Sequence, residues 1–333
     1  MFQKIIIWGH PLYSHTHSYV NYGYERAFKK LGYTTFWFHD NDFPKDFDYS
    51  NSLFFTEGYA DQNIPINNSS IYVVHCCRNP EKYYGQVNRL IDLRFNYLFL
   101  NDCNYNYILD ESKCVKISDA TYYEKLIDTS SITKYKDSPI SMNWEAIYTT
   151  WATDLLPEEI NFDWKNLERE KKIYYSASIS NTNEKEVHKF KAESEKNGIL
   201  FTTFDPWSNP YSMEENRARI QKSFIMPDIR GSGMRYTNYG LDNGCNHKLI
   251  GTIPCRIFKT ISYGQLGGTN SKRIYDFFDH VVIYDDDESK LFHKMLEKKD
   301  DKQLIQKQME LVKEKHTYIN RAKDLLYVIE NFN

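Results

Sequence analysis

Residues 4–40, KIIIWGHPLYSHTHSYVNYGYERAFKKLGYTTFWFHD, decide the fold. The stretch opens with a continuous apolar run at residues 4–8, which is typical of a strand buried on both faces of a parallel sheet. A helical pattern follows over residues 18–30, with Ser18 as a candidate N-cap. A second strand is predicted at residues 34–38. This order of strand, helix and strand predicts a βαβ unit and therefore a parallel sheet.

The same alternation of short apolar runs and helical patterns continues along the chain. Further strands are predicted at residues 52–55, 71–75, 97–100, 172–178, 199–204, 224–229 and 281–285, and helices at about 183–197, 213–221 and within 247–263. Residues 151–170 interrupt the alternation with a proline and a run of charges, as an interdomain connection does. The pattern on both sides predicts an α/β fold of two Rossmann-like domains facing a central cleft. We place the N-terminal domain at residues 1–155 and the C-terminal domain at residues 156–333.

Length and composition agree with two globular domains. A chain of 333 residues exceeds what one hydrophobic core usually holds, and a hydrophobic fraction of 41% excludes wholesale disorder. The net charge of −3 gives no electrostatic case for nucleic acid or an anionic membrane as a partner, so we expect neither. The 27 tyrosines suit stacking on sugars, although a general compositional bias explains them equally well.

The cysteines and the N-terminus indicate the compartment. No two of the six cysteines have Cys-x-x-Cys spacing, which argues against a zinc knuckle and favours free thiols in a reducing compartment. The apolar run near the N-terminus is too short for a signal peptide or a membrane span. We therefore predict a cytoplasmic protein with no integral membrane segment.

The segment at residues 227–271 combines glycines, basic residues and hydroxyls after predicted strand ends, where open α/β sheets bind ligands. A diphosphate is best bound by Arg or Lys together with backbone N–H groups at glycine-rich turns. The predicted ligand-binding set in the C-terminal half is Ser176, Ser178, Arg230, Gly231, Lys248, Arg256, Lys259, Tyr263, Gly264, Thr269, Asn270 and Ser271. The alternative is an ordinary helix with solvated Lys and Arg and glycines at its ends, and spacing alone leaves it open.

Within this segment, IPCRIFKTISYGQLGGTN at residues 253–270 resembles the nucleotide-sugar-binding helix of GT-B glycosyltransferases. The matching positions are Pro254, Arg256, Phe258 and Gly264. The tail HTYINRAKDLL, residues 316–326, is similar to the ending of CgeB-like glycosyltransferase domains. The resemblance, to the glycosyltransferase group 1 and CgeB-like nucleotide-sugar-binding domain, covers about residues 172–330. Lys259 departs from it, because the family has there a Glu that binds ribose hydroxyls, and a Lys cannot accept from a hydroxyl.

The resemblance implies a GT-B glycosyltransferase whose C-terminal domain binds a nucleotide sugar. It would move a hexosyl or deoxyhexosyl group from a UDP- or GDP-linked donor to a glycan or another hydroxyl acceptor held by the N-terminal domain. A second hypothesis is a catalytically inactive protein that binds glycans or nucleotide sugars with the same fold, and Lys259 is its strongest argument. A nicotinamide-dependent dehydrogenase is disfavoured, because the turn after the first strand lacks the Gly-x-Gly-x-x-Gly pattern.

The turn after the first strand carries candidate general bases, since a histidine titrates near neutral pH. His15 is favoured over His10, because a position in the middle of the loop leaves its ring freer to reach an acceptor. Asp40, at the end of the second strand, is the alternative carboxylate or orients a histidine. The competing interpretation is that these histidines cap or pack the first helix. His15 and His17 have no nearby set of Asp, Glu or Cys in the sequence, so we expect no metal and no other cofactor.

Overall fold

The computed structural model of the chain divides into two compact units, and each is described by itself. The described residues are 2–77, 79–99, 108–125, 145–177, 179–180, 182–204, 211–232, 235–237, 240–242, 247–250 and 253–332. Among them, the first unit comprises residues up to 99, those from 108 to 150, and residues 318–332, while the second comprises residues 151–317.

The first unit is built on one mixed sheet with the strand order β2-β1-β3-β4-β5-β10-β9-β8. The strands from β2 to β10 in this order are parallel, and β9 and β8 are antiparallel to their neighbours. The elements are β1 (Lys4–Trp8), α1 (His17–Lys30), β2 (Thr35–Phe38), β3 (Ser52–Glu57), β4 (Ile71–His75), a short 3-10 turn (Pro80–Lys82), β5 (Arg89–Phe95), β6 (Leu98–Phe99), β7 (Ile108–Leu109), β8 (Val115–Ser118), β9 (Thr121–Glu124), β10 (Glu145–Thr149) and α9 (Tyr318–Asn331).

The predicted βαβ unit is confirmed. β1 and β2 are parallel neighbours, and α1 lies between them in the chain. The helix begins at His17 with Thr16 in the N-cap position, so the predicted N-cap Ser18 lies two residues after it, inside the helix, and is buried. The continuous apolar run of β1 is buried on both faces of the sheet, and α1 buries Val20, Tyr24, Ala27 and Phe28, which recur at helical spacing.

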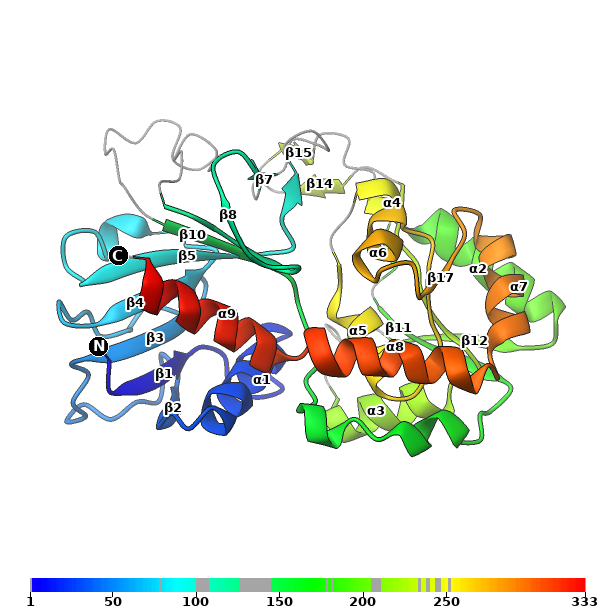
Figure 1. The fold of residues 1–333 in the computed structure, drawn as a ribbon, viewed down its shortest axis with the longest axis horizontal. Coiled ribbons are helices and arrows are strands. Elements are labelled where there is room, and N and C mark those ends of the chain that lie inside the picture. The colour runs from blue at the N-terminus through cyan, green and yellow to red at the C-terminus, as the bar shows by residue number, and fades with distance from the viewer. Residues whose placement is uncertain are drawn as a thin grey trace. The chain divides into compact units, whose positions relative to one another are not determined.

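The last helix, α9, packs in the first unit against α1 (Figure 1). The Tyr318 ring lies so close to Gly23 that a Cβ there would approach it to 2.2 Å. The Arg321 guanidinium donates to the Thr150 carbonyl at 3.2 Å and to its hydroxyl at 2.9 Å. Asp324 accepts hydrogen bonds from side chains of the β8–β9 hairpin. The division predicted from the sequence assigned residues 318–333 to the C-terminal domain, because it followed chain order and not these contacts.

The second unit has two sets of parallel strands: β12 pairs with β11 in one, and β13, β16 and β17 pair in that order in the other, while β11 lies beside β13. Its elements are 3-10 turns at Pro157–Glu159 and Phe162–Asn166, β11 (Lys172–Ser176), α2 (Glu184–Lys196), β12 (Leu200–Phe204), α3 (Met213–Lys222), β13 (Met226–Asp228), the hairpin β14 (Arg235–Thr237) and β15 (Gly240–Asp242), α4 (His247–Ile250), α5 (Cys255–Ser262), β16 (Gly267–Thr269), α6 (Lys272–Phe277), β17 (Ile283–Tyr284), α7 (Glu288–Lys298) and α8 (Lys302–Lys315).

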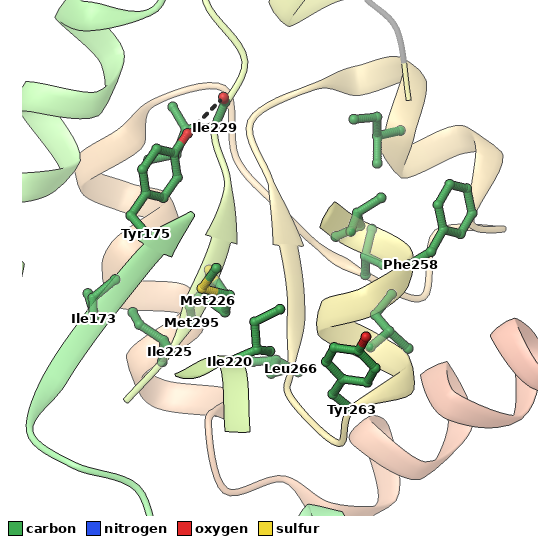
Figure 2. Close-up of a cluster of buried hydrophobic side chains, with 14 of the residues drawn as sticks. Ile173, Tyr175, Ile220, Ile225, Met226, Ile229, Phe258, Tyr263, Leu266 and Met295 are labelled. Atoms are coloured by element: carbon green, nitrogen blue, oxygen red, sulfur yellow. Dashed lines mark hydrogen bonds between the residues drawn. The ribbon is translucent and has the colours of Figure 1, made fainter. Parts of the chain in front are cut away.

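Figure 2 shows the core of the second unit, where β11, β13 and β16 run in the same direction. Side chains from the strands meet those of α5, which buries Ile257, Phe258 and Ile261. The Tyr175 hydroxyl donates to the carbonyl of Ile229 at 3.4 Å and so ties the end of β11 to the segment after β13. The carboxyl ends of these strands therefore meet at one edge of the sheet.

In the part of the chain that the structure describes, no helix combines the length and the apolar character needed to cross a membrane.

Candidate functional site

Arg256, in the first turn of α5, joins two neighbouring strand ends of the second unit. Its Nε and Nη2 donate to Asp228 Oδ1 at 3.2 and 2.5 Å, and its Nη1 donates to the Ser176 carbonyl at 3.4 Å. The guanidinium also stacks over the Tyr175 ring, 4.8 Å from its centroid. Asp228 is buried, so Arg256 compensates its charge where water cannot. The predicted ligand-binding Arg256 therefore lies at the carboxyl edge of the sheet.

Asn270, just after β16, fixes the backbone of Arg230, just after β13. Its Oδ1 accepts from the Arg230 N–H at 2.7 Å, and its Nδ2 donates to the Arg230 carbonyl at 2.8 Å. The same Nδ2 donates to Oε1 of Glu288 at 2.8 Å. The Asn270 side chain is fully buried, so its amide positions Arg230 and is itself shielded from solvent.

Lys248 and Gly231 complete this group. The Lys248 ammonium lies 2.8 Å from Oε1 of the buried Glu288, and its backbone N–H donates to the Gly231 carbonyl at 3.0 Å. A Cβ on Gly231 would come within 1.7 Å of the Thr182 carbonyl oxygen, because the backbone before α2 runs directly over it. Only glycine permits this close approach. Arg230, Gly231, Lys248 and Asn270 are thus joined through shared partners, and Arg256 binds Asp228 at the end of β13.

Lys259 and Tyr263 are directed to a different group. The Tyr263 hydroxyl donates to both oxygens of the buried Asp154, at 2.7 and 2.8 Å, and Lys259 Nζ lies 3.9 Å from Asp154 Oδ1. Burial, and then the Asp154 charge, raise the pKa of Tyr263 well above its usual value. Lys259 therefore supplies positive charge beside a buried carboxylate. This is a structural reason for a Lys where the resembling family has Glu, and it differs from the phosphate contact that the sequence suggested.

The remaining predicted residues build the framework of this region. Gly264 follows α5 with φ +86°, and a Cβ there would meet the Trp164 backbone at 2.7 Å. Thr269 and Ser271 are fully buried; Thr269 donates to Asp228, and Ser271 accepts from the Ile274 N–H as the N-cap of α6. Ser176 pairs its hydroxyl with that of Tyr211. Ser178 lies outside the described residues.

The first unit holds a second polar cluster, at the carboxyl ends of β1, β3 and β4. Glu57 and His75 end β3 and β4 and are partners in the register of these parallel strands. Glu57 Oε1 lies 2.9 Å from His10 Nε2, and Oε2 lies 2.5 Å from His17 Nδ1. Glu57 is 3% exposed. The histidine turn after β1 is therefore gathered around one buried carboxylate.

His15 belongs to the same cluster. Its ring centroid is 4.2 Å from that of His10 and 5.2 Å from that of His17, whose ring in turn lies 4.8 Å from that of His75. Burial, followed by the neighbouring His10 and His17, lowers the pKa of His15 although Glu57 opposes the shift. Burial and then His17 hold the pKa of His75 well below its usual value. The imidazoles of His15 and His75 are therefore biased toward their neutral forms.

Asp40, the third predicted catalytic residue, has a structural role, because its carboxylate joins two segments of the first unit. Its Oδ1 accepts from Trp8 Nε1 and from the Asn63 N–H, both at 2.9 Å, and its Oδ2 accepts from the Gln62 N–H at 2.9 Å. These bonds tie the end of β2 to the loop after β3. The carboxylate placed beside the histidines is Glu57, so the alternative in which Asp40 orients a histidine does not match the structure.

No set of Asp, Glu or Cys lies near His15 and His17 in the sequence, but the fold brings Glu57 beside the histidines. Two groups of three potential metal ligands occur in the described residues, each with its ligand atoms within 4.8 Å of one another: His10, His15 and Glu57, and His17, Glu57 and His75. Sequence reasoning missed Glu57 and His75, although His75 ends a predicted strand and Glu57 lies two residues after the end of another. The rule that ligands bind at the carboxyl ends of parallel strands would have identified them.

No protein-family model matches the chain, and no curated protein does either. Solved structures are similar to it. T4 phage BGT in complex with its UDP-glucose substrate matches at 10% identity with a TM-score of 0.50, over 99% of this chain and 100% of that chain. An α-glucosyltransferase in complex with UDP and DNA containing an HMU base matches at 10% identity with a TM-score of 0.50, over 99% and 98% of the two chains.

These likenesses establish the fold and no more. The chain has the α/β fold of GT-B glycosyltransferases, with two Rossmann-like domains, as the sequence predicted. The broad resemblance to glycosyltransferases is supported, whereas the narrower one to group 1 and CgeB-like domains is not. The prediction that nucleic acid is not a partner is weakened, because one solved structure of this fold holds DNA.

Proposed function

We propose that this chain is a glycosyltransferase that takes a sugar from a nucleotide-diphosphate sugar and transfers it to a hydroxyl acceptor. The observation that carries the proposal is the group formed by Arg230, Lys248 and Arg256 at the carboxyl edge of the second unit's sheet. Cations at this edge of an open α/β sheet suit a diphosphate, whose charge grows as the sugar leaves.

The buried carboxylates beside these cations support the same function. Asp228 holds Arg256, and Glu288 holds Lys248. Long side chains fixed in this way lose less conformational entropy when an anion binds. The Asn270 amide does the same for the backbone of Arg230. The site is therefore organised before a donor arrives.

The solved structures of the same fold suggest which donor to test first, because they were determined with UDP-glucose and with UDP. A UDP-hexose is thus the leading donor, and GDP-linked and deoxyhexosyl donors are the next to test. The acceptor is a glycan or another hydroxyl compound. A hydroxymethylated base in DNA belongs among the candidates, because it offers a primary hydroxyl and one of these structures contains DNA.

For the general base we propose His10 in place of His15. Nδ1 of His15 accepts from the His17 backbone N–H at 3.2 Å, which places its own proton on Nε2 and leaves no acceptor there. His10 has Nε2 beside Glu57 at 2.9 Å, so the carboxylate favours a proton on Nε2 and leaves Nδ1 able to accept one. The His10 side chain is 29% exposed, which an acceptor hydroxyl requires.

The test is a panel of UDP-, GDP-, dTDP- and CMP-sugars, screened by thermal shift and then by turnover. A donor at 100 times its dissociation constant should add about 2.7 kcal/mol to the free energy of unfolding. Stabilising donors are then incubated with glycan acceptors and with hydroxymethylated DNA, and products are identified by mass spectrometry. No stabilisation by any nucleotide sugar contradicts the proposal. Binding without transfer to any acceptor favours the catalytically inactive alternative.

A further inference from the structure

Three potential ligands on neighbouring elements of the first unit converge on one point. They are His17, the first residue of α1, and Glu57 and His75, which end the paired strands β3 and β4. Their ligand atoms all lie within 4.8 Å of one another. Strand register and a helix start position these groups, and such elements hold a metal site more accurately than loops do.

Glu57 is a buried carboxylate whose charge is not compensated by hydrogen bonds. The carboxylate is buried, and neither of its oxygens receives a hydrogen bond. Nitrogens of His17 and His10 lie within ion-pair distance of it, but not in hydrogen-bonding geometry. Burying a carboxylate is costly unless charge or hydrogen bonds compensate it. Two imidazoles and a buried carboxylate with ligand atoms within 4.8 Å of one another are a donor set that a metal ion could bind together.

We propose that His17, Glu57 and His75 bind one divalent transition-metal ion, of which Zn²⁺ is the leading candidate. Two imidazoles and one carboxylate form a ligand set that zinc enzymes use, and they leave a further position for water or substrate. Hard cations such as Mg²⁺ and Ca²⁺ prefer oxygen ligands, so the two imidazoles favour zinc and its neighbours in the first transition row.

The competing group of His10, His15 and Glu57 shares the carboxylate but is less buried. We assign the ion to the more buried group, in which Glu57 Oε2 is directed to His17 and Oε1 is left to His10. His10 Nε2, 2.9 Å from Oε1, lies where a supporting group for a metal-ligating carboxylate is expected. The assignment is compatible with His10 as general base, and it does not depend on transferase activity.

The test measures bound metal in the full chain. Protein stripped with a chelator is dialysed against Zn²⁺ and then against metal-free buffer, and zinc is counted by mass spectrometry. We expect one zinc per wild-type chain. Glu57→Gln and His75→Asn should weaken the affinity, measured by chelator competition, more than about 100-fold, the upper range for groups that only support a ligand. His188→Ala, at an exposed position on α2, is the matched control and should bind as the wild type does.

Two further measurements keep the result decisive. His15→Asn should retain the ion; zinc lost in His15→Asn but kept in His75→Asn would overturn the assignment to the more buried group. If the Glu57 or His75 variants fail to melt cooperatively, the wild type is loaded with Co²⁺. An intense visible spectrum of low-coordinate cobalt supports the site, and the weak spectrum of hydrated cobalt overturns it. A folded wild type that retains only trace zinc also overturns it.

Discussion

Asn270→Ala is the change that most directly tests how the second unit holds its cations. The substitution removes one hydrogen bond to the Arg230 N–H, one to the Arg230 carbonyl and one to Glu288. Glu288 is buried and Arg230 is partly buried, so at about 1 kcal/mol per lost bond the expected loss is about 3 kcal/mol. For a unit of this size that corresponds to a melting temperature lower by about 6–12 °C.

The assay is calorimetric melting together with titration of UDP-glucose well below the melting transition. Because Arg230 loses its backbone clamp, donor affinity should fall even where the variant is fully folded. Asn197→Ala removes one exposed hydrogen bond to the Glu193 carbonyl and is the control, expected within about 0.5 kcal/mol of the wild type.

Asn270→Asp tests the hydrogen bonds that the Asn270 amide donates separately from the one that it accepts. It keeps the acceptor for the Arg230 N–H, but it places a carboxylate against Glu288 where the Nδ2 stood at 2.8 Å. We therefore expect it to be at least as destabilising as the alanine variant. A melting temperature for Asn270→Ala within about 2 °C of the wild type, or a stable Asn270→Asp, would refute the clamp.

Three further predictions concern activity and stability. Arg230→Ala should lower kcat/KM by about 2–4 kcal/mol of transition-state stabilisation, whereas Lys272→Ala, which removes an exposed helix pair, should not; equal activity would place the phosphate site elsewhere. His10→Ala should reduce turnover roughly 10²–10⁴-fold with donor affinity unchanged, and His15→Ala should have the smaller effect; the reverse order in a single-turnover assay would restore His15 as the base. Tyr263→Phe should lower the free energy of unfolding by about 1.5–3 kcal/mol in urea, because it removes the hydroxyl from a buried carboxylate, and an unchanged midpoint would contradict that bond's importance.

Local patterns predicted the elements of this fold well, because strand runs, helix periods and end signals lie within a few residues of one another. The βαβ start and the helix before Gly198 are examples, and α2 spans Glu184–Lys196 against a predicted range of about 183–197. Local sequence patterns do not predict that Glu57 and His75 are neighbours in the sheet. Their pairing depends on the order of β3 and β4 in the sheet, which no local pattern specifies.

The candidate donor site shows the same limit. The predicted set included Arg256 and Asn270, which lie at strand ends, and also Lys259 and Tyr263, whose side chains pair with Asp154. Asp154 lies more than a hundred positions away in the sequence, so the residues around α5 do not indicate that Lys259 and Tyr263 pair with it. Whether a charged side chain awaits a ligand or already has a partner is decided by tertiary contacts.

The position of α9 in the first unit has a consequence for biosynthesis. Domains usually fold in the order in which they leave the ribosome. Here the sheet that begins at Lys4 lacks Tyr318, Arg321 and Asp324 until residues 151–317 have been translated. The later unit can thus reach its native state while the earlier one still waits for its final helix, and a nascent chain stalled near residue 317 would display an unfinished first unit to chaperones and proteases.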